Sequence, residues 1–178
     1  MSETLGLVKL GSSEGHELED LKVELKDRFG DYDVRVFNPL DIPALAFDSL
    51  REQYHSTRIL ALLEEHAQTV GAQHLLGVTS FDLYVPGMNF VFGEARCPGR
   101  AAVISTYRLS VGSSNNPKLF GSRVVKEAVH EIGHMLGLKH CSEALCVMYF
   151  SERLADTDRK EADFCSNCEH RMRLVEVE

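Results

Sequence analysis

Residues 130–140 read HEIGHMLGLKH. On an α-helix, His130 and His134 lie about one turn apart on the same face, so both imidazoles can bind one metal ion. Gly137 can adopt the left-handed conformation that ends a helix, after which the chain can turn back and supply His140 as a third ligand. The stretch therefore predicts a three-histidine Zn²⁺ site at the end of a mostly buried helix.

Glu131 lies beside the two helical histidines, where it can hold a water molecule rather than the metal. Three nitrogen ligands leave the fourth position of a tetrahedral zinc site open, which distinguishes a catalytic site from a structural one. Water bound there has its pKa lowered to roughly 7. We therefore expect Glu131 to act as the general base of a hydrolase. Chance surface and core histidines are the alternative, and Gly137 and His140 argue against it because each adds a requirement to the short motif.

Four of the five cysteines form two short pairs. Cys141 and Cys146 are separated by four residues, and Cys165 and Cys168 form a C-x-x-C. Two such pairs can close a four-thiolate site, so we expect a structural Zn²⁺ there and two zinc ions per chain in all. Scattered buried thiols or a redox pair remain the alternative. The remaining Cys97 is expected in a turn or in packing, with a latency switch that occupies the catalytic zinc as its alternative.

Length, composition and charge favour one compact domain without nucleic-acid or membrane partners. A chain of 178 residues that is 44% hydrophobic can bury one good core. Its net charge of −8 repels phosphate backbones and anionic lipids. The apolar runs are too short to span a membrane, and the first residues lack the pattern of an export signal. We expect a cytoplasmic protein, monomeric by default, with thiols rather than disulfides.

Hydrophobic periodicity predicts alternating strands and helices, and hence a layered α/β sheet. The predicted strands cover residues 5–10, 32–37, 74–84, 89–94 and 101–109. The predicted helices cover residues 14–29, 57–70, 123–136 and 165–177. The connecting segments are a turn at 11–13, an irregular stretch at 39–54 with one helical turn at 49–54, a polar loop at 110–122 and an irregular stretch at 141–163.

The long zinc motif, followed eight residues later by Met148, resembles the signature of the metzincin clan of zinc peptidases. Further motifs resemble the archaemetzincin family over most of the chain from about residue 32 onward. These are His140-Cys141, Cys146-Val147-Met148, Cys165-Ser166-Asn167-Cys168, Asp82-Leu83-Tyr84 and Asn89-Phe90-Val91-Phe92-Gly93.

The resemblance implies a metzincin-like zincin fold of the α/β (α+β) class. It would comprise a twisted mixed sheet with an antiparallel edge strand, a backing helix, the active-site helix and a small lower part with the four-cysteine zinc site. A single metallopeptidase domain at 1–178 would then divide into an upper part at about 1–137 and a lower part at about 138–178. We expect the edge strand at 101–109, where free backbone groups could bind an extended peptide.

Two residues after the zinc motif are also expected in the site. Met148 should form an apolar floor beneath the zinc, although an ordinary core methionine would pack in a similar way. Tyr149 stands where the family leads us to expect a small polar residue. Its two interpretations are support of the oxyanion and plain packing.

Together, the motif and the resemblance imply zinc-dependent hydrolysis of peptide bonds. We expect no pro-segment, because strand-like residues begin almost at once, and a cytosolic endopeptidase without latency would endanger its host. Short peptides or peptide termini are therefore the expected substrates. A catalytically silent zinc- or peptide-binding module is one alternative. A three-histidine metal-dependent endoribonuclease is another, but its class needs a basic surface and lacks the glutamate at 131.

Overall fold

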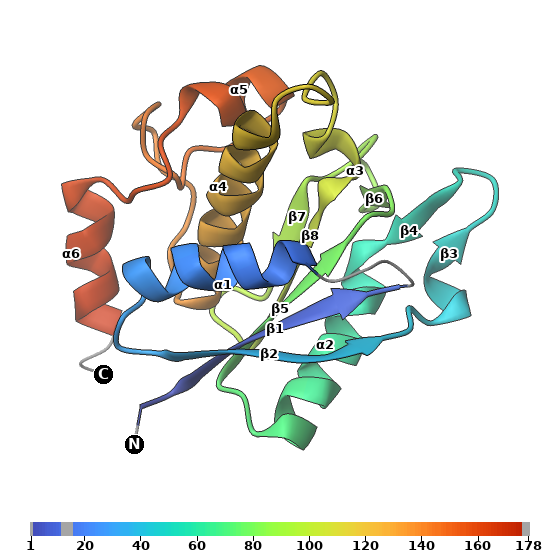
Figure 1. Cartoon of the computed structure of the whole chain (residues 1–178), viewed down its shortest axis with the longest axis horizontal. Coiled ribbons are helices and arrows are strands. Elements are labelled where there is room, and N and C mark those ends of the chain that lie inside the picture. The colour runs from blue at the N-terminus through green and yellow to red at the C-terminus, as the bar shows by residue number, and fades with distance from the viewer. Residues whose placement is uncertain (1, 12–15, 176–178) are drawn as a thin grey trace.

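The computed structural model describes residues 2–11 and 16–175 (Figure 1). Its main sheet has five strands, of which four run parallel and the last, at one edge, is antiparallel to its neighbour. In spatial order these strands are β2 (Asp33–Leu40), β1 (Thr4–Leu10), β5 (His74–Thr79), β8 (Ala101–Ser105) and β7 (Gly93–Ala95). The predicted mixed α/β sheet with an antiparallel edge strand is confirmed.

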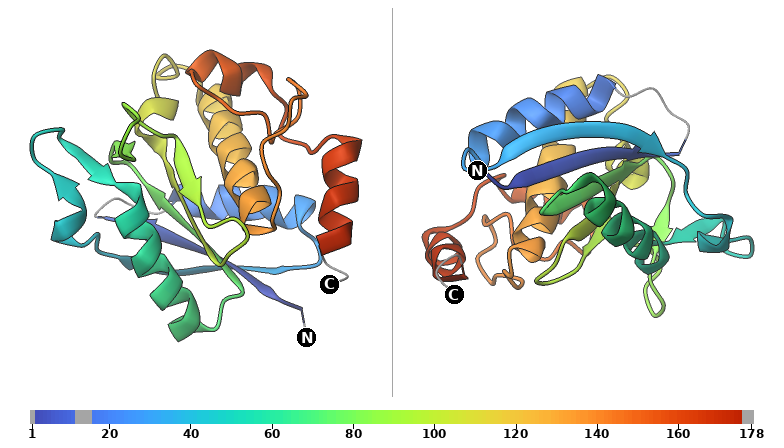
Figure 2. Two further views of the ribbon diagram at one scale, coloured as in Figure 1. Left: turned by 180° about the vertical axis from the view of Figure 1, so that it is seen from behind. Right: turned by 90° about the horizontal axis from the view of Figure 1, so that it is seen from below.

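Helices cover both faces of this sheet. Helices α1 (His16–Arg28) and α4 (Pro117–Met135) pack on one face, and α2 (Ser56–Val70) packs on the other (Figure 2). Side chains alternate across each strand, so Leu7 of β1 joins the core under α1 and α4, whereas Val8 joins the core under α2. Both cores are apolar, and the buried face of α4 is thereby held against β7 and β8.

The edge strand is not where the sequence predicted it. Residues 101–109 were expected at the edge, but β8 lies between β5 and β7 and ends at Ser105. All five β8 residues are buried, which is typical of an interior parallel strand. The Ser105 side chain accepts a hydrogen bond from the Tyr107 backbone N–H and starts the short helix α3 (Thr106–Leu109). The predicted strand therefore combines a strand and a helix.

A second, three-stranded sheet stands at the side of the molecule (Figure 1). It contains β3 (Phe47–Asp48), β4 (Gln53–His55) and β6 (Leu83–Tyr84), and η1 (Ala44–Ala46) precedes it. The helical turn predicted at 49–54 is wrong, because this stretch forms the turn of the β3–β4 hairpin and the start of β4. Asp48 Oδ1 accepts the N–H groups of Leu50 and Arg51, which favours a turn over a helix.

Two more predicted strands are shorter than expected. The strand predicted at 74–84 is broken into β5 and β6, and the strand predicted at 89–94 begins only at Gly93. Side chains of the hairpin take up the carbonyl groups that a ladder would use. Arg51 donates to the carbonyls of Met88 and Asn89, at 3.0 Å each, and Gln53 also donates to Asn89. Residues 85–92 therefore form a fixed loop.

The metal-bearing helix is longer than predicted. It begins at Pro117 rather than at residue 123, because the Asn116 side chain accepts the N–H of Leu119 and proline fits the first helical turn. The irregular stretch predicted at 141–163 contains the short helix α5 (Leu154–Arg159), and α6 (Ser166–Val175) follows. Parts of the predicted turn at 11–13 and of the two terminal helices lie outside the described residues. Among the described residues, no helix combines the length and apolar character needed to cross a membrane.

Candidate metal centre

Helix α4 presents His130, Glu131 and His134 at its C-terminal end, and the first two are nearly buried, with 4% of each exposed. The helix ends as predicted. Gly137 has a φ of 91°, and the Leu138 N–H donates to the Gly133 carbonyl at 2.9 Å. This reversal brings His140 back toward the helix.

The three imidazoles converge through their Nε2 atoms. His134 Nε2 lies 3.2 Å from His130 Nε2 and 3.2 Å from His140 Nε2. In a tetrahedral zinc site with Zn–N distances of roughly 2.0–2.1 Å, two nitrogen ligands lie about 3.3 Å apart. The spacing of the imidazoles therefore fits a single zinc ion.

Backbone carbonyls set the tautomers of two of these rings. His130 Nδ1 lies 2.7 Å from the Val147 carbonyl, and His134 Nδ1 lies 2.7 Å from the Leu138 carbonyl. Since a carbonyl only accepts, both Nδ1 atoms carry the proton and both Nε2 atoms present a lone pair. Burial also lowers the pKa of His130, His134 and His140, which favours neutral rings. Two lone pairs at 3.2 Å repel each other unless a cation lies between them.

Glu131 lies between α4 and the edge strand. A Cβ atom on Gly93 of β7 would be 2.6 Å from Glu131 Oε1, so only glycine leaves room for the carboxylate. Burial raises the pKa of Glu131 well above its ordinary value. The charges of Glu127 and Glu94 raise this pKa further, and the charge of Lys160 lowers it. A carboxylate held in this way can take up and release a proton.

A cleft of about 980 Å³ opens over these residues. Its walls are β7, the loop at 85–92, the exposed end of the α4 face and residues 150–152. Phe150 lines the cleft and lies 4.9 Å from the His140 ring, between ring centroids. Tyr149 does not line the cleft, and the guanidinium of Arg159 lies 5.3 Å from the centroid of its ring. Its support of an oxyanion stays a prediction.

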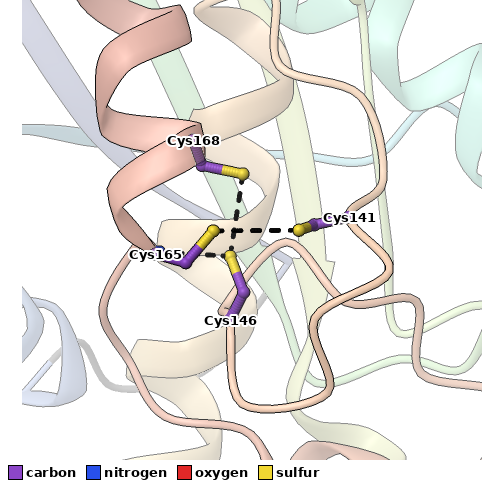
Figure 3. A group of neighbouring side chains, drawn as sticks. All are labelled: Cys141, Cys146, Cys165 and Cys168. Carbon is purple, nitrogen blue, oxygen red and sulfur yellow. Dashed lines mark hydrogen bonds between the residues drawn. The ribbon is translucent and has the colours of Figure 1, made fainter.

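The four paired cysteines also come together (Figure 3). The Sγ atoms of Cys141 and Cys165 are 3.8 Å apart, and those of Cys146 and Cys168 are 3.7 Å apart. Zn–S bonds of about 2.3 Å in a tetrahedral site place sulfur atoms about 3.8 Å apart. Burial raises the pKa of the Cys146 and Cys168 thiols, so a bound cation would be needed to keep these two as thiolates. The cluster fits a structural zinc ion.

Met148 lies beneath the helix, fully buried. A Cβ atom on Gly133 would be 2.5 Å from Met148 Sδ, so this glycine allows the methionine to pack directly against α4. Successive carbonyls of the same turn bind two different sites: Val147 accepts from His130, and Met148 accepts from the Cys141 N–H at 2.9 Å. The turn therefore joins the three-histidine and the four-cysteine groups.

Sequence reasoning missed a buried ion pair beside the site. Lys160 Nζ lies 3.1 Å from Glu127 Oε1, and both side chains are almost fully buried. Glu127 lines the cleft together with His130 and Glu131. The available signal in the sequence was the position of Glu127, one helical turn before His130 and Glu131 on α4. Cys97 is exposed at the cleft wall, and its Sγ atom lies 3.4 Å from the Leu138 carbonyl oxygen. Its role in a turn or in packing, and the alternative of a latency switch, stay predictions.

Comparisons of the sequence and of the fold with known proteins give consistent matches. Residues 20–174 match the family described as peptidase family M54. The archaemetzincin of Archaeoglobus fulgidus is 45% identical over 162 residues, which cover 91% of this chain and 94% of the relative. The crystal structure of the archaemetzincin from Methanopyrus kandleri superposes with a TM-score of 0.88 at 34% identity, covering 99% of this chain and 97% of that one. The A. fulgidus crystal structure, complexed with malonate, gives a TM-score of 0.82 at 42% identity and covers 94% and 99%.

Proposed function

Since the chain belongs to peptidase family M54, the archaemetzincins, and is a zinc metallopeptidase, we propose that it cleaves peptide bonds at its three-histidine site with Glu131 as general base. The observation that carries this proposal is the convergence of three Nε2 atoms within 4.8 Å of one another at the floor of an open cleft, with a buried carboxylate next to them.

His130, His134 and His140 would hold the ion. When bound, zinc supplies Lewis-acid chemistry: it favours deprotonation of a water molecule and polarises the carbonyl that is attacked. The Val147 and Leu138 carbonyls keep two of the imidazoles in the ligating tautomer.

Glu131 performs the proton transfers. Its carboxylate takes the proton of the water molecule as the new C–O bond forms, and it gives that proton to the leaving nitrogen as the C–N bond breaks. General-base help of this kind is worth about 10² to 10⁴-fold in rate. Gly93 and the burial of Glu131 restrict the carboxylate to the cleft side of the helix.

Short peptides or peptide termini are the proposed substrates. The cleft volume of about 980 Å³ suits a few residues rather than a folded protein. The edge strand β7 lines the cleft, and the backbone groups on its outer side are available to pair with an extended peptide.

The four cysteines complete the proposed metal content. Cys141, Cys146, Cys165 and Cys168 would hold a structural zinc ion, which makes two zinc ions per chain. Such a site would fix the lower part of the protein, because it connects the segment after His140 to α6.

A panel of short fluorogenic peptides tests the proposed reaction. The zinc-loaded chain should cleave members of the panel, lose activity with a chelator and regain it with Zn²⁺. Glu131→Gln should remove turnover and leave the zinc content at wild-type level. Equal activity in the two proteins would refute the role of Glu131, and no turnover in either would favour a silent binding module.

A further inference from the structure

The buried ion pair between Glu127 and Lys160 neither gives nor takes a proton in the reaction described above. The Lys160 side chain is 0% exposed and that of Glu127 is 3% exposed. Thr157 Oγ1 also donates to Glu127 Oε1, at 3.0 Å, and Lys160 Nζ lies 3.4 Å from the Tyr149 carbonyl. Thr157 and Lys160, which both follow the Met148 turn, therefore bind the same oxygen of the Glu127 carboxylate on α4.

Glu127 has the position of a metal ligand without acting as one. It precedes His130 by three residues and lines the same cleft, and carboxylate oxygens are ordinary zinc ligands. The Glu-x-x-His spacing on a helix presents both side chains to one metal ion in carboxylate-bridged metal proteins. Even so, Glu127 belongs to neither of the two groups of converging metal ligands in the described part of the chain, and the group beside it consists of His130, His134 and His140.

We propose that Lys160 is a positioning residue that engages Glu127 and keeps its carboxylate away from the metal, so that the three imidazoles remain the only protein ligands. The fourth position then stays open for water and substrate. The inference rests on the proposed three-histidine metal site, but it does not depend on which peptides are cleaved.

Removal of one or the other half of the pair should change the metal affinity in opposite directions. Removal of the ammonium leaves an unpaired buried carboxylate beside the site, which attracts the divalent ion. Removal of the carboxylate charge leaves an unpaired ammonium, which repels the ion. A pair that served only to stabilise the fold would weaken metal binding in both cases, because loss of either partner leaves a buried charge without compensation.

The test uses Lys160→Met, Glu127→Gln and the double variant, each with the four-cysteine zinc retained and the three-histidine metal titrated. Relative to wild type, Lys160→Met should bind Zn²⁺ on the order of tenfold more tightly, and Glu127→Gln on the order of tenfold more weakly. The double variant should return close to the wild-type affinity. With Co²⁺ at the three-histidine site, the d–d absorption bands of Lys160→Met should differ in position and intensity from those of wild type, because a carboxylate oxygen replaces or joins the water molecule on the metal.

Arg123→Met is the matched control. Arg123 forms a second ion pair from α4, with Asp158 at 2.7 Å, and it does not line the cleft. This variant should lower the melting temperature and leave the Co²⁺ spectrum unchanged. If Lys160→Met does not fold, Lys160→Leu replaces it, since leucine also removes the ammonium and offers no donor to Glu127.

Weaker zinc binding in Lys160→Met, or a Co²⁺ spectrum like that of wild type, would overturn the proposal. These readouts do not involve peptide cleavage. A chain that binds metal as expected but cleaves no peptide would count against the proposed function alone.

Discussion

Gly93 of the edge strand and Glu131 of the active-site helix are packed so closely that a methyl group on residue 93 would lie 2.6 Å from Glu131 Oε1. The same methyl group would lie 2.8 Å from the Val103 carbonyl, so the strand could not easily move to make room. The glycine thereby determines where the carboxylate stands.

Gly93→Ala should displace the Glu131 carboxylate without removing a metal ligand. We expect kcat to fall on the order of 10²-fold, since a shift of about 1 Å in a catalytic group can have that effect, while zinc content stays unchanged. Steady-state kinetics together with metal analysis would check this. Wild-type kcat in Gly93→Ala would show that the close contact does not position the base.

Two glycines of α4 should respond in opposite ways to alanine. A Cβ atom on Gly121 meets nothing within 4 Å, whereas one on Gly133 meets Met148 Sδ at 2.5 Å and Phe164 at 3.0 Å. Gly121→Ala should stabilise the protein by about 0.5–1 kcal/mol, as alanine does in a helix interior. Gly133→Ala should destabilise it by about 1–3 kcal/mol through overpacking. Denaturant unfolding measures both, and equal effects would contradict the packing described for Met148.

Cys165→Ser should weaken zinc binding at the three-histidine site, although Cys165 belongs to the other group. His140 and Cys141 are adjacent, so a metal ion held by the four cysteines would anchor the loop that carries His140. The expected loss is about 10–100-fold in affinity, the range for residues that orient metal ligands. Unchanged three-histidine affinity in Cys165→Ser would separate the two sites.

The pair between Arg123 and Asp158 should make stability depend on acid pH. The hydrogen bond from Arg123 lowers the pKa of Asp158 below its ordinary value. The contribution of this ion pair to stability is therefore present at pH values above the ordinary aspartate pKa. It is lost as the pH falls through the lower pKa that Asp158 has in the folded state. Asp158→Asn should have a lower melting temperature than wild type at neutral pH, and the difference should shrink in acid. A difference that is constant with pH would contradict this pair's role.

The members of the two candidate metal groups were predictable because they come from local motifs. The imidazoles and thiols that converge come from short motifs, in which helical periodicity and the turn at Gly137 determine the geometry. The alternation of strands and helices was predictable for the same reason, from the period of the apolar residues.

Features that depend on distant residues were not predictable in this way. Lys160 lies 33 residues from Glu127, and no periodic pattern connects the two. The position of β7 at the edge depends on its pairing with β8, and its residues are too few to show an alternation. Local propensity favours a strand that begins at residue 89. In the structure, hairpin side chains bind the carbonyls of Met88 and Asn89, and residues 85–92 form a loop instead.

Anomalous diffraction from crystals of the protein at the zinc absorption edge would locate the zinc ions and their ligands. We expect two peaks per chain, one inside the four-cysteine group and one bonded to Nε2 of His130, His134 and His140 with no fourth protein ligand. A three-histidine position that stays empty in excess zinc, or one whose fourth position is filled by a protein atom in every molecule, would contradict this expectation.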